Sequence, residues 1–191
     1  DRNQSEKKPF HIPVRISLIN RAGETVVQDA LYELTQQTHT FKFENVSADI
    51  YPSVFREFTA PVRLSTDFSD QDLVFLMARD TDPFNQWRAA QTLFINEIKN
   101  LVTAIQDNRA MTVSPGLVQA FSLALEERKK DRAFLSKALA LPLETEIKDH
   151  FKIIDVEAIH QARVFLKQTL AKKLESELKT VYEICRSANP D

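Results

Sequence analysis

The sequence contains a single cysteine, Cys185, among its 191 residues. One cysteine cannot build an internal disulfide framework, and its isolation is typical of a reducing compartment. The chain also lacks a signal-peptide pattern and any apolar run long enough to span a bilayer. We therefore expect a cytoplasmic protein with no membrane partner.

Neither sign of charge dominates the chain. It has 25 Lys and Arg against 27 Asp and Glu, a net charge of −2 and a pI near 6.1, and the two signs are interspersed. A protein that binds nucleic acid or anionic lipid carries a concentrated basic patch. The sequence therefore predicts no nucleic-acid partner.

Histidines are few and scattered. His11, His39, His150 and His160 are the only four, and no two of them lie three to five residues apart. Zinc sites draw on closely spaced His and Cys residues, which this chain does not offer. We predict that the chain holds no metal and no other cofactor.

The pattern of apolar residues changes from a period of two to a helical period near Ser69. Strands therefore precede helices without alternating with them, which predicts an α+β protein of segregated type. We expect a partial β-sandwich domain over residues 1–66 and an all-α domain over residues 67–191, built as a helical array of the solenoid or bundle type.

Alternating residues mark the strands of the first part. Phe10 to Leu18 alternates strictly, and Asn20 to Gly23 is typical of a turn. Several short strands at close spacing favour a sandwich or barrel piece. The further segments that we expect to be extended are Thr25–Val27, Leu31–Leu34, Thr40–Phe43, Ser53–Phe58 and Val62–Leu64.

Capping residues mark the helices of the second part. Ser69 with Asp72 forms a capping box, and Asp82 precedes a proline at a first helical position. Ser114-Pro115 starts another helix, and Asp155 caps the last one. An apolar stripe from Ile159 to Cys185 predicts that this last helix is continuous and roughly 40 Å long.

Five features resemble functional sites but have simpler interpretations. Glu157 and His160 could share a metal on one helix face, yet di-iron bundles need a second such pair, and a surface pair is favoured. Asp149-His150 has no nucleophile beside it and is interpreted as a solvated helix end. The other interpretations are core packing for Trp87 beside Phe84, a small buried hydrophobe for Cys185, and an exposed helix end for Glu126 to Arg132. We therefore assign no catalytic, cofactor-binding or metal-binding residue.

The junction itself carries a motif. The stretch Ser69 to Gln91, with Phe58 and Ala60 to Leu64 before it, closely resembles the point in bacterial M1-family zinc metalloaminopeptidases where a small β-sandwich meets a large helical domain. Lys8 to Val14, Phe41 to Val46 and Phe151 to Asp155 resemble other parts of the same region. Gln86 departs from the family, in which Arg is frequent at this point. The matching residues of the junction are Ser69, Asp70, Leu73, Phe75 to Met77, Asp82, Phe84, Trp87, Ala89 and Gln91.

The catalytic motifs of that family are missing. Its H-E-x-x-H helix supplies two zinc ligands and a general base, and its G-x-M-E-N loop recognises the substrate amino group. Neither is present, and the only glycines are Gly23 and Gly116. The resemblance therefore implies a non-catalytic scaffold fragment of an aminopeptidase that removes N-terminal residues from peptides. The parent would hold zinc, and its catalytic domain would be the intramolecular partner.

Two other functions stay open from the sequence. A free-standing helical-repeat module that binds a protein is one, because helix-pair arrays are common adaptors. An enzyme complete within these residues is the other. The reading frame upstream discriminates the scaffold fragment from the interaction module, because only the fragment requires H-E-x-x-H to be encoded before Asp1. An assay of the chain with aminoacyl anilides and added Zn²⁺ tests the complete enzyme.

Two structural expectations follow from the idea of a fragment. The strand from Phe10 to Leu18 should leave one edge of its sheet unpaired, because the family has further strands before it. Weak self-association through the last helix is also predicted. Its leucines at 166, 170, 174 and 178 would be uncovered unless they face the preceding helix.

Overall fold

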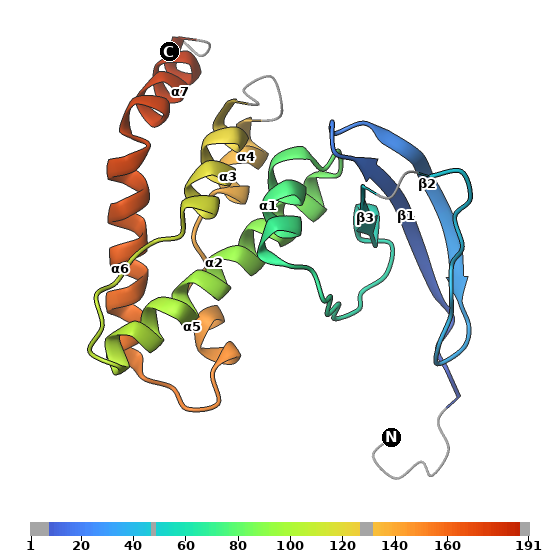
Figure 1. Ribbon diagram of the computed structural model, residues 1–191, viewed down its shortest axis with the longest axis horizontal. Helices are drawn as coiled ribbons and strands as arrows, with labels where there is room; N and C mark the ends of the chain where they lie inside the picture. Colours follow the sequence, from blue (N-terminus) through green and yellow to red (C-terminus); the bar gives the residue numbers. More distant parts are fainter. Residues whose placement is uncertain (1–7, 47–48, 127–131, 188–191) are drawn as a thin grey trace. The chain divides into compact units, whose positions relative to one another are not determined.

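The computed structural model describes residues 8–46, 49–126 and 132–187. They form two compact units. Unit 1 comprises Asp1–Asp67 and Asp80–Asn85, and unit 2 comprises Phe68–Arg79 and Gln86–Asp191. Strands lie in the first part of the chain and helices α1 to α7 in the second, so the predicted α+β class is confirmed (Figure 1).

A three-stranded antiparallel sheet forms the body of unit 1. It consists of β1 (Ile12–Asn20), β2 (Thr25–Leu34) and β3 (Ile50–Val54) in the order β2-β1-β3. The alternating residues of β1 point into the core, where Val14, Ile16 and Leu18 are 2 to 4% exposed. Residues Asn20 to Gly23 form the predicted turn, in which the Gly23 amide donates to the Asn20 carbonyl at 2.9 Å.

The expected unpaired edge at Phe10 to Leu18 is correct only for the first half of β1: Ile12 to Arg15 pairs with β2 alone, whereas from Ile16 onward the strand has a partner on both sides. β1 is the central strand, bonded to β2 along one side and to β3 along the other, so β2 and β3 are the edges. The prolines fit this order. Pro52 lies in edge strand β3, and Pro13 lies before Ile16, where the pairing of β1 with β3 begins.

Other strand predictions need correction. The segments Thr25–Val27 and Leu31–Leu34 belong to one strand, because a bulge at Asp29, with φ of 38°, absorbs the change of face. Segment Ser53–Phe58 is the end of β3 followed by the short helix η1 (Arg56–Phe58). Segments Thr40–Phe43 and Val62–Leu64 are irregular, although Phe41 packs on Tyr32 with ring centroids 4.6 Å apart.

The predicted caps begin the helices where expected. Before α1 (Asp70–Arg79), the Ser69 amide and hydroxyl both donate to the Asp72 carboxylate, and the Asp72 amide donates to the Ser69 hydroxyl. Before α2 (Pro83–Gln106), Asp82 accepts from the Asn85 amide at 3.0 Å. These bonds satisfy backbone donors that a helix start leaves free.

Helix α2 organises unit 2. Its Asn96 donates to Asp70 at the start of α1, and its Gln106 donates to Asp155 at the start of α6 (Val156–Lys173). Glu97, only 7% exposed, accepts from the amide and hydroxyl of Ser114, directly before α3 (Pro115–Glu126). Phe94 in α2 meets Phe121 in α3 with ring centroids 6.2 Å apart. One long helix therefore fixes the starts of three others.

Several of the remaining helices are short, and the last one differs from the prediction. Between α3 and the last helices lie α4 (Arg132–Ala138), α5 (Glu144–Ile147) and η2 (Lys148–His150). The predicted continuous last helix is wrong. It is divided at Leu174 into α6 (Val156–Lys173) and α7 (Glu175–Ser187), which bend relative to one another in Figure 1. No helix in the described part of the chain is both long enough and apolar enough to cross a membrane.

The leucine stripe of the last helices is already covered. Leu166, Leu170 and Leu174 are 0 to 4% exposed, and only Leu178 is half-buried. These side chains therefore pack within unit 2, and the argument that they would be uncovered is wrong.

Candidate functional site

The densest polar cluster in the described residues surrounds Arg56 in unit 1. The Arg56 side chain is 8% exposed and uses all three guanidinium nitrogens. Nε donates to Asp29 at 2.6 Å, and Nη2 donates to Thr81 at 2.9 Å. Nη1 donates to Ser53 at 3.0 Å and to Asp80 at 2.8 Å. Arg56 thus joins β2, β3 and the segment Asp80–Asn85 of unit 1.

The bulge in β2 aims Asp29 at this cluster. Because φ is positive at Asp29, the strand kinks there, and the Asp29 amide donates to the Ser17 hydroxyl at 2.8 Å. The Ser17 hydroxyl in turn donates to Asp29 Oδ1 at 3.0 Å. Phe55 and Glu57, on either side of Arg56, also have positive φ, so the cluster fixes a backbone that non-glycine residues adopt rarely.

The segment after α1 supplies the opposite side of the cluster. The Asp82 amide donates to Asp80 Oδ1 at 2.9 Å, and Asp82 Oδ2 accepts from the Glu57 amide. The Asn85 side-chain amide donates to the Ser53 hydroxyl at 2.7 Å and to the Val54 carbonyl at 3.2 Å. Among the described residues, two buried oxygens have no partner, Asp80 Oδ2 and Asn85 Oδ1.

The electrostatics of the cluster differ between its two ends. At the inner end, burial raises the pKa of Asp80, and bonds from Asp82 and Ser53 with the charge of Arg56 only partly oppose it. At the outer end, desolvation also acts to raise the pKa of Asp29, but bonds from Arg56 and Ser17 outweigh it and lower that pKa. One guanidinium therefore faces carboxyl groups that hold their protons with different strength.

The cluster links three backbone segments of unit 1 through buried side chains. Asp80, Ser53 and Asn85 are 0 to 2% exposed, so these side chains are closed to solvent. Histidine, the commonest general base, is not among the partners that the structure gives to Arg56 or Asp80. Sequence reasoning missed this cluster because Arg56 lies 24 to 27 positions from Asp29, Asp80 and Thr81. The only signal was Arg56 among the apolar residues of a predicted strand.

The structure separates the residue pairs considered from the sequence. His160 Nδ1 lies 2.9 Å from Glu144, while Glu157 accepts from Gln161, so Glu157 and His160 do not share a partner. Asp149 and His150 are exposed in η2, in agreement with a solvated helix end.

The interpretation of Trp87 as a core residue is wrong. Trp87, near the start of α2, is 37% exposed, whereas Ala90, Phe94 and Ile98 on the apolar stripe of the same helix are fully buried. Cys185 is half-buried in α7, less than predicted. Of the predicted exposed end Glu126 to Arg132, Glu126 is exposed, and residues 127–131 and the side chain of Arg132 lie outside the described part.

The zinc implied by the family resemblance does not fit the described residues. Across residues 8–46, 49–126 and 132–187, no three His, Cys, Asp or Glu side chains gather closely enough to hold a metal ion. The prediction that no residue of this chain is catalytic stays a prediction.

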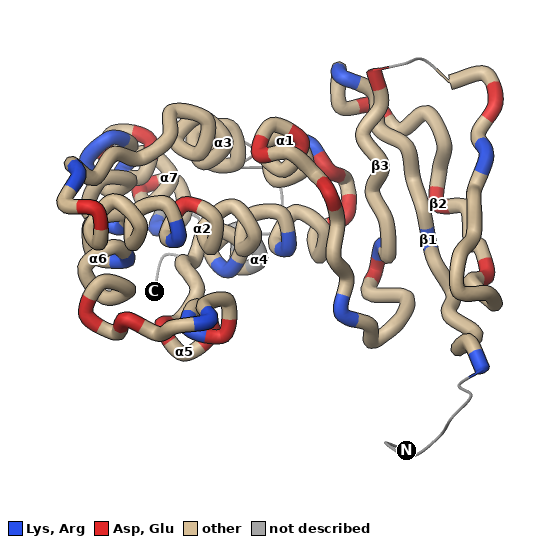
Figure 2. Tube along the Cα trace, turned by 60° about the horizontal axis from the view of Figure 1, so that its bottom comes forward, with Lys and Arg blue, Asp and Glu red and all other residues tan. Residues whose placement is uncertain are grey.

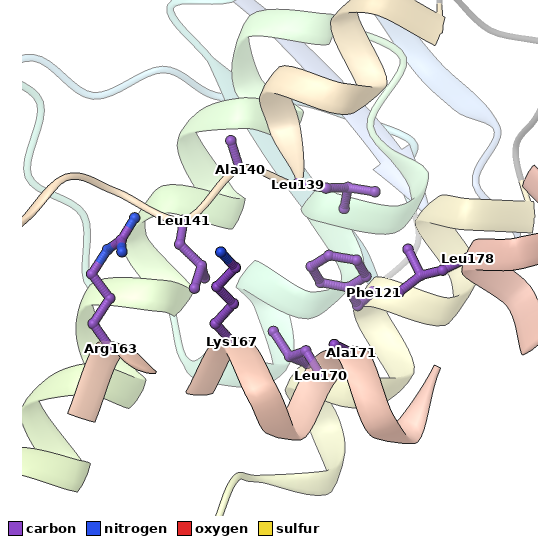
Figure 3. A pocket seen from close by; sticks show the side chains of 9 residues that line it. All are labelled: Phe121, Leu139, Ala140, Leu141, Arg163, Lys167, Leu170, Ala171 and Leu178. Atoms are coloured by element: carbon purple, nitrogen blue, oxygen red, sulfur yellow. The ribbon is translucent and has the colours of Figure 1, made fainter. Parts of the chain in front are cut away.

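A cavity of about 350 Å³ opens in unit 2 (Figure 3). Its walls come from α3, α6, α7 and the segment before α5, and they are mostly apolar. Two basic side chains, Arg163 and Lys167, also line it. Sequence reasoning did not identify it, because the lining residues come from four separate segments.

Two family descriptions cover nearly the whole chain. Residues 1–67 match a domain of unknown function, DUF3458, described as having an Ig-like fold. Residues 70–191 match the domain of unknown function DUF3458_C, described as ARM repeats. Both descriptions agree with the observed order of a β unit followed by a helical array.

Curated relatives extend this similarity to named proteins. Aminopeptidase N of Escherichia coli K12 is 35% identical over 168 residues, which are 84% of this chain and 19% of the relative. Aminopeptidase N of Haemophilus influenzae is 31% identical over 169 residues, again 84% of this chain and 19% of the relative. The chain thus spans about a fifth of the length of the relatives it matches.

A solved structure has a similar fold. Legionella pneumophila aminopeptidase A, crystallised in complex with aspartic acid, superposes with a TM-score of 0.80 at 26% sequence identity. The match covers 95% of this chain and 21% of that one.

Proposed function

Because the chain belongs to the DUF3458 family of Ig-like and ARM-repeat domains and matches part of aminopeptidase N, we propose that it is a non-catalytic scaffold of an M1-family zinc aminopeptidase. The parent enzyme removes N-terminal residues from peptides. Its zinc and its catalytic groups reside in a catalytic domain outside these residues, and that domain is the intramolecular partner of this chain. The β-sandwich part ends near residue 66, and the helical part begins at residue 67.

A single observation carries this proposal. The similarity to aminopeptidase N runs through 84% of the chain but through only 19% of the relative. Within the matched part, the described residues bring together no metal-binding set, and Asp80, Ser53 and Asn85 of the densest polar cluster are closed to solvent. A chain with the family's supporting domains and no accessible reactive cluster is suited to hold other parts of an enzyme in place.

Cytoplasmic location and the absence of nucleic-acid and membrane partners are part of the same proposal. The single cysteine supports a reducing compartment. Acidic and basic residues are interspersed along the chain (Figure 2), which supports a partner other than a polyanion. Weak self-association of the isolated chain also stays a proposal, although Leu166, Leu170 and Leu174 are buried and do not support it.

The experiment that tests the scaffold role uses the longer protein that contains this chain. Glutamine replaces all four histidines, at 11, 39, 150 and 160, which are this chain's strongest candidates for a zinc ligand or a general base. We expect kcat for an aminoacyl anilide to stay within about twofold of the wild-type value. As a matched control, replacing the Glu of the encoded H-E-x-x-H by Gln should reduce kcat by about a thousandfold or more.

Two results would contradict the proposal. A tenfold fall in kcat on loss of these histidines, with the fold intact by circular dichroism, would place a catalytic group in this chain. A reading frame that encodes no H-E-x-x-H would instead favour the free-standing interaction module, for which the ARM-repeat description is the supporting observation.

A further inference from the structure

The cavity in unit 2 combines an apolar floor with two cations. Phe121 and Leu170, 6% and 4% exposed, are buried residues of its lining, and Leu139, Leu141 and Leu178 add further large apolar side chains. Figure 3 shows Arg163 and Lys167 rising from successive turns of α6 on the side nearest Leu141, with Phe121, Leu170 and Leu178 on the other side. The polar end and the apolar end of the cavity are therefore distinct.

The Arg163 side chain is held in position by the backbone. Its Nε donates to the Pro142 carbonyl at 2.8 Å, which fixes the plane of the guanidinium. The two terminal nitrogens have no hydrogen bond or ion pair to a residue in the described part of the chain. A guanidinium fixed at Nε offers a pair of parallel N–H groups, which matches the geometry of a carboxylate.

Lys167 adds a second unpaired charge. It lies four residues after Arg163 on the same helix, its side chain is exposed, and it makes no ion pair with any described residue. None of the nine residues that line the cavity is acidic. The charge at this end is therefore positive and uncompensated by the lining.

From this arrangement we propose that the cavity binds a small carboxylate carried on an apolar chain, such as a free medium-chain fatty acid. The carboxylate lies between Arg163 and Lys167, and the apolar chain lies against Phe121, Leu170 and Leu178. A volume of about 350 Å³ is at the small end of the range for ligand pockets, which suits one slender molecule. The proposal is argued from the lining residues and does not depend on the aminopeptidase assignment.

Titration of the 191-residue chain with decanoate, followed by amide chemical shifts in NMR, tests the site. We expect saturable shifts confined to residues 139–142, 163–171 and 178 and to the neighbourhood of Phe121. Decylammonium, with the same chain length and the opposite charge, should bind at least about tenfold more weakly, because it would meet two like charges.

Matched variants distinguish specific binding at the cavity from nonspecific binding of decanoate. Lys167→Gln should weaken decanoate binding about fivefold, the size of a partly exposed ion pair. Lys172→Gln removes the same charge from an exposed position on the same helix outside the cavity lining, and should leave binding unchanged. Arg163→Lys keeps the charge but loses the planar fork, and should weaken binding about threefold.

Several results would overturn the proposal. Equal binding of decanoate and decylammonium, or an unchanged affinity in Lys167→Gln, would show that the cations do not select the ligand. Shifts at the cavity that follow protein concentration and not decanoate would assign it to a second copy of the chain. Decanoate binding to this chain but not to the longer protein would show that the protein's own further residues cover the cavity.

Discussion

Arg56 Nη1 lies 2.8 Å from Asp80 Oδ1, in a pair that is 24 positions apart in the sequence and closed to solvent. The Arg56 side chain is 8% exposed and that of Asp80 is 0% exposed. Removing one member of such a pair leaves the other as an uncompensated buried charge. The pair therefore makes the position of the segment Asp80–Asn85 within unit 1 sensitive to a single side chain.

Replacement of Arg56 by Met should lower the free energy of unfolding by about 3 to 5 kcal/mol. The reason is the unpaired Asp80 carboxylate, with the loss of the bonds to Asp29 and Thr81. Urea denaturation at pH 7 measures the effect. Arg109→Met removes an exposed pair with Asp107 and should cost less than about 1 kcal/mol. If both variants lose the same amount, the buried pair is not a stabilising feature.

The pH dependence of stability should reveal Asp80. Because burial raises its pKa in the folded state, the native state binds a proton more tightly than the unfolded state. The stability contributed by this proton is present below the unfolded pKa and is lost as pH rises through the raised value. Wild-type stability relative to Asp80→Asn should therefore fall as pH rises from 4 to 7. A constant difference over this range would show that Asp80 titrates alike in both states.

Substitution of Ser69 by Ala should cost about 1 kcal/mol, because it removes the capping box of α1. The Asp72 amide then loses its hydroxyl acceptor at 3.2 Å. Ser136→Ala, at an exposed position inside α4, provides the control and should change stability by less than about 0.5 kcal/mol. Thermal or urea unfolding compares the two, and equal effects would contradict the assignment of Ser69 as a cap.

Hydrogen exchange should be slowest in β1. From Ile16 to Asn20 this strand has a neighbour on both sides, so its amides bond alternately to β2 and β3. In the edge strands, every second amide faces away from β1 and should exchange faster. Protection as strong along the whole of β2 as in β1, in a demonstrated monomer, would mean that a further segment covers that edge.

Local signals explain which parts of the fold were predictable. Ser69, Asp82 and Asp155 cap their own helices through bonds over three residues, so the sequence contains both partners side by side. The division between α6 and α7 at Leu174 has no glycine or proline near it that would predict a helix break. The order of the strands depends on pairing between distant segments. Long-range contacts of this kind leave no periodic signal.

The polar cluster was unpredictable for the same reason. Asp29 reaches Arg56 only because a bulge turns it, and Asp80 reaches Arg56 only after the chain has passed through α1. In the sequence, each is an isolated charged residue. No residue was assigned as catalytic because the H-E-x-x-H and G-x-M-E-N motifs are missing. The sequence alone reveals that these motifs are missing.

The central claim is that this chain supports an aminopeptidase without performing its chemistry. Its most direct test is an assay of the purified, tag-free chain with aminoacyl anilides and added Zn²⁺, together with elemental analysis of bound zinc after dialysis. We predict turnover no higher than a metal-only control and less than about 0.1 equivalent of zinc. Turnover above that control, or one equivalent of retained zinc, would contradict the claim.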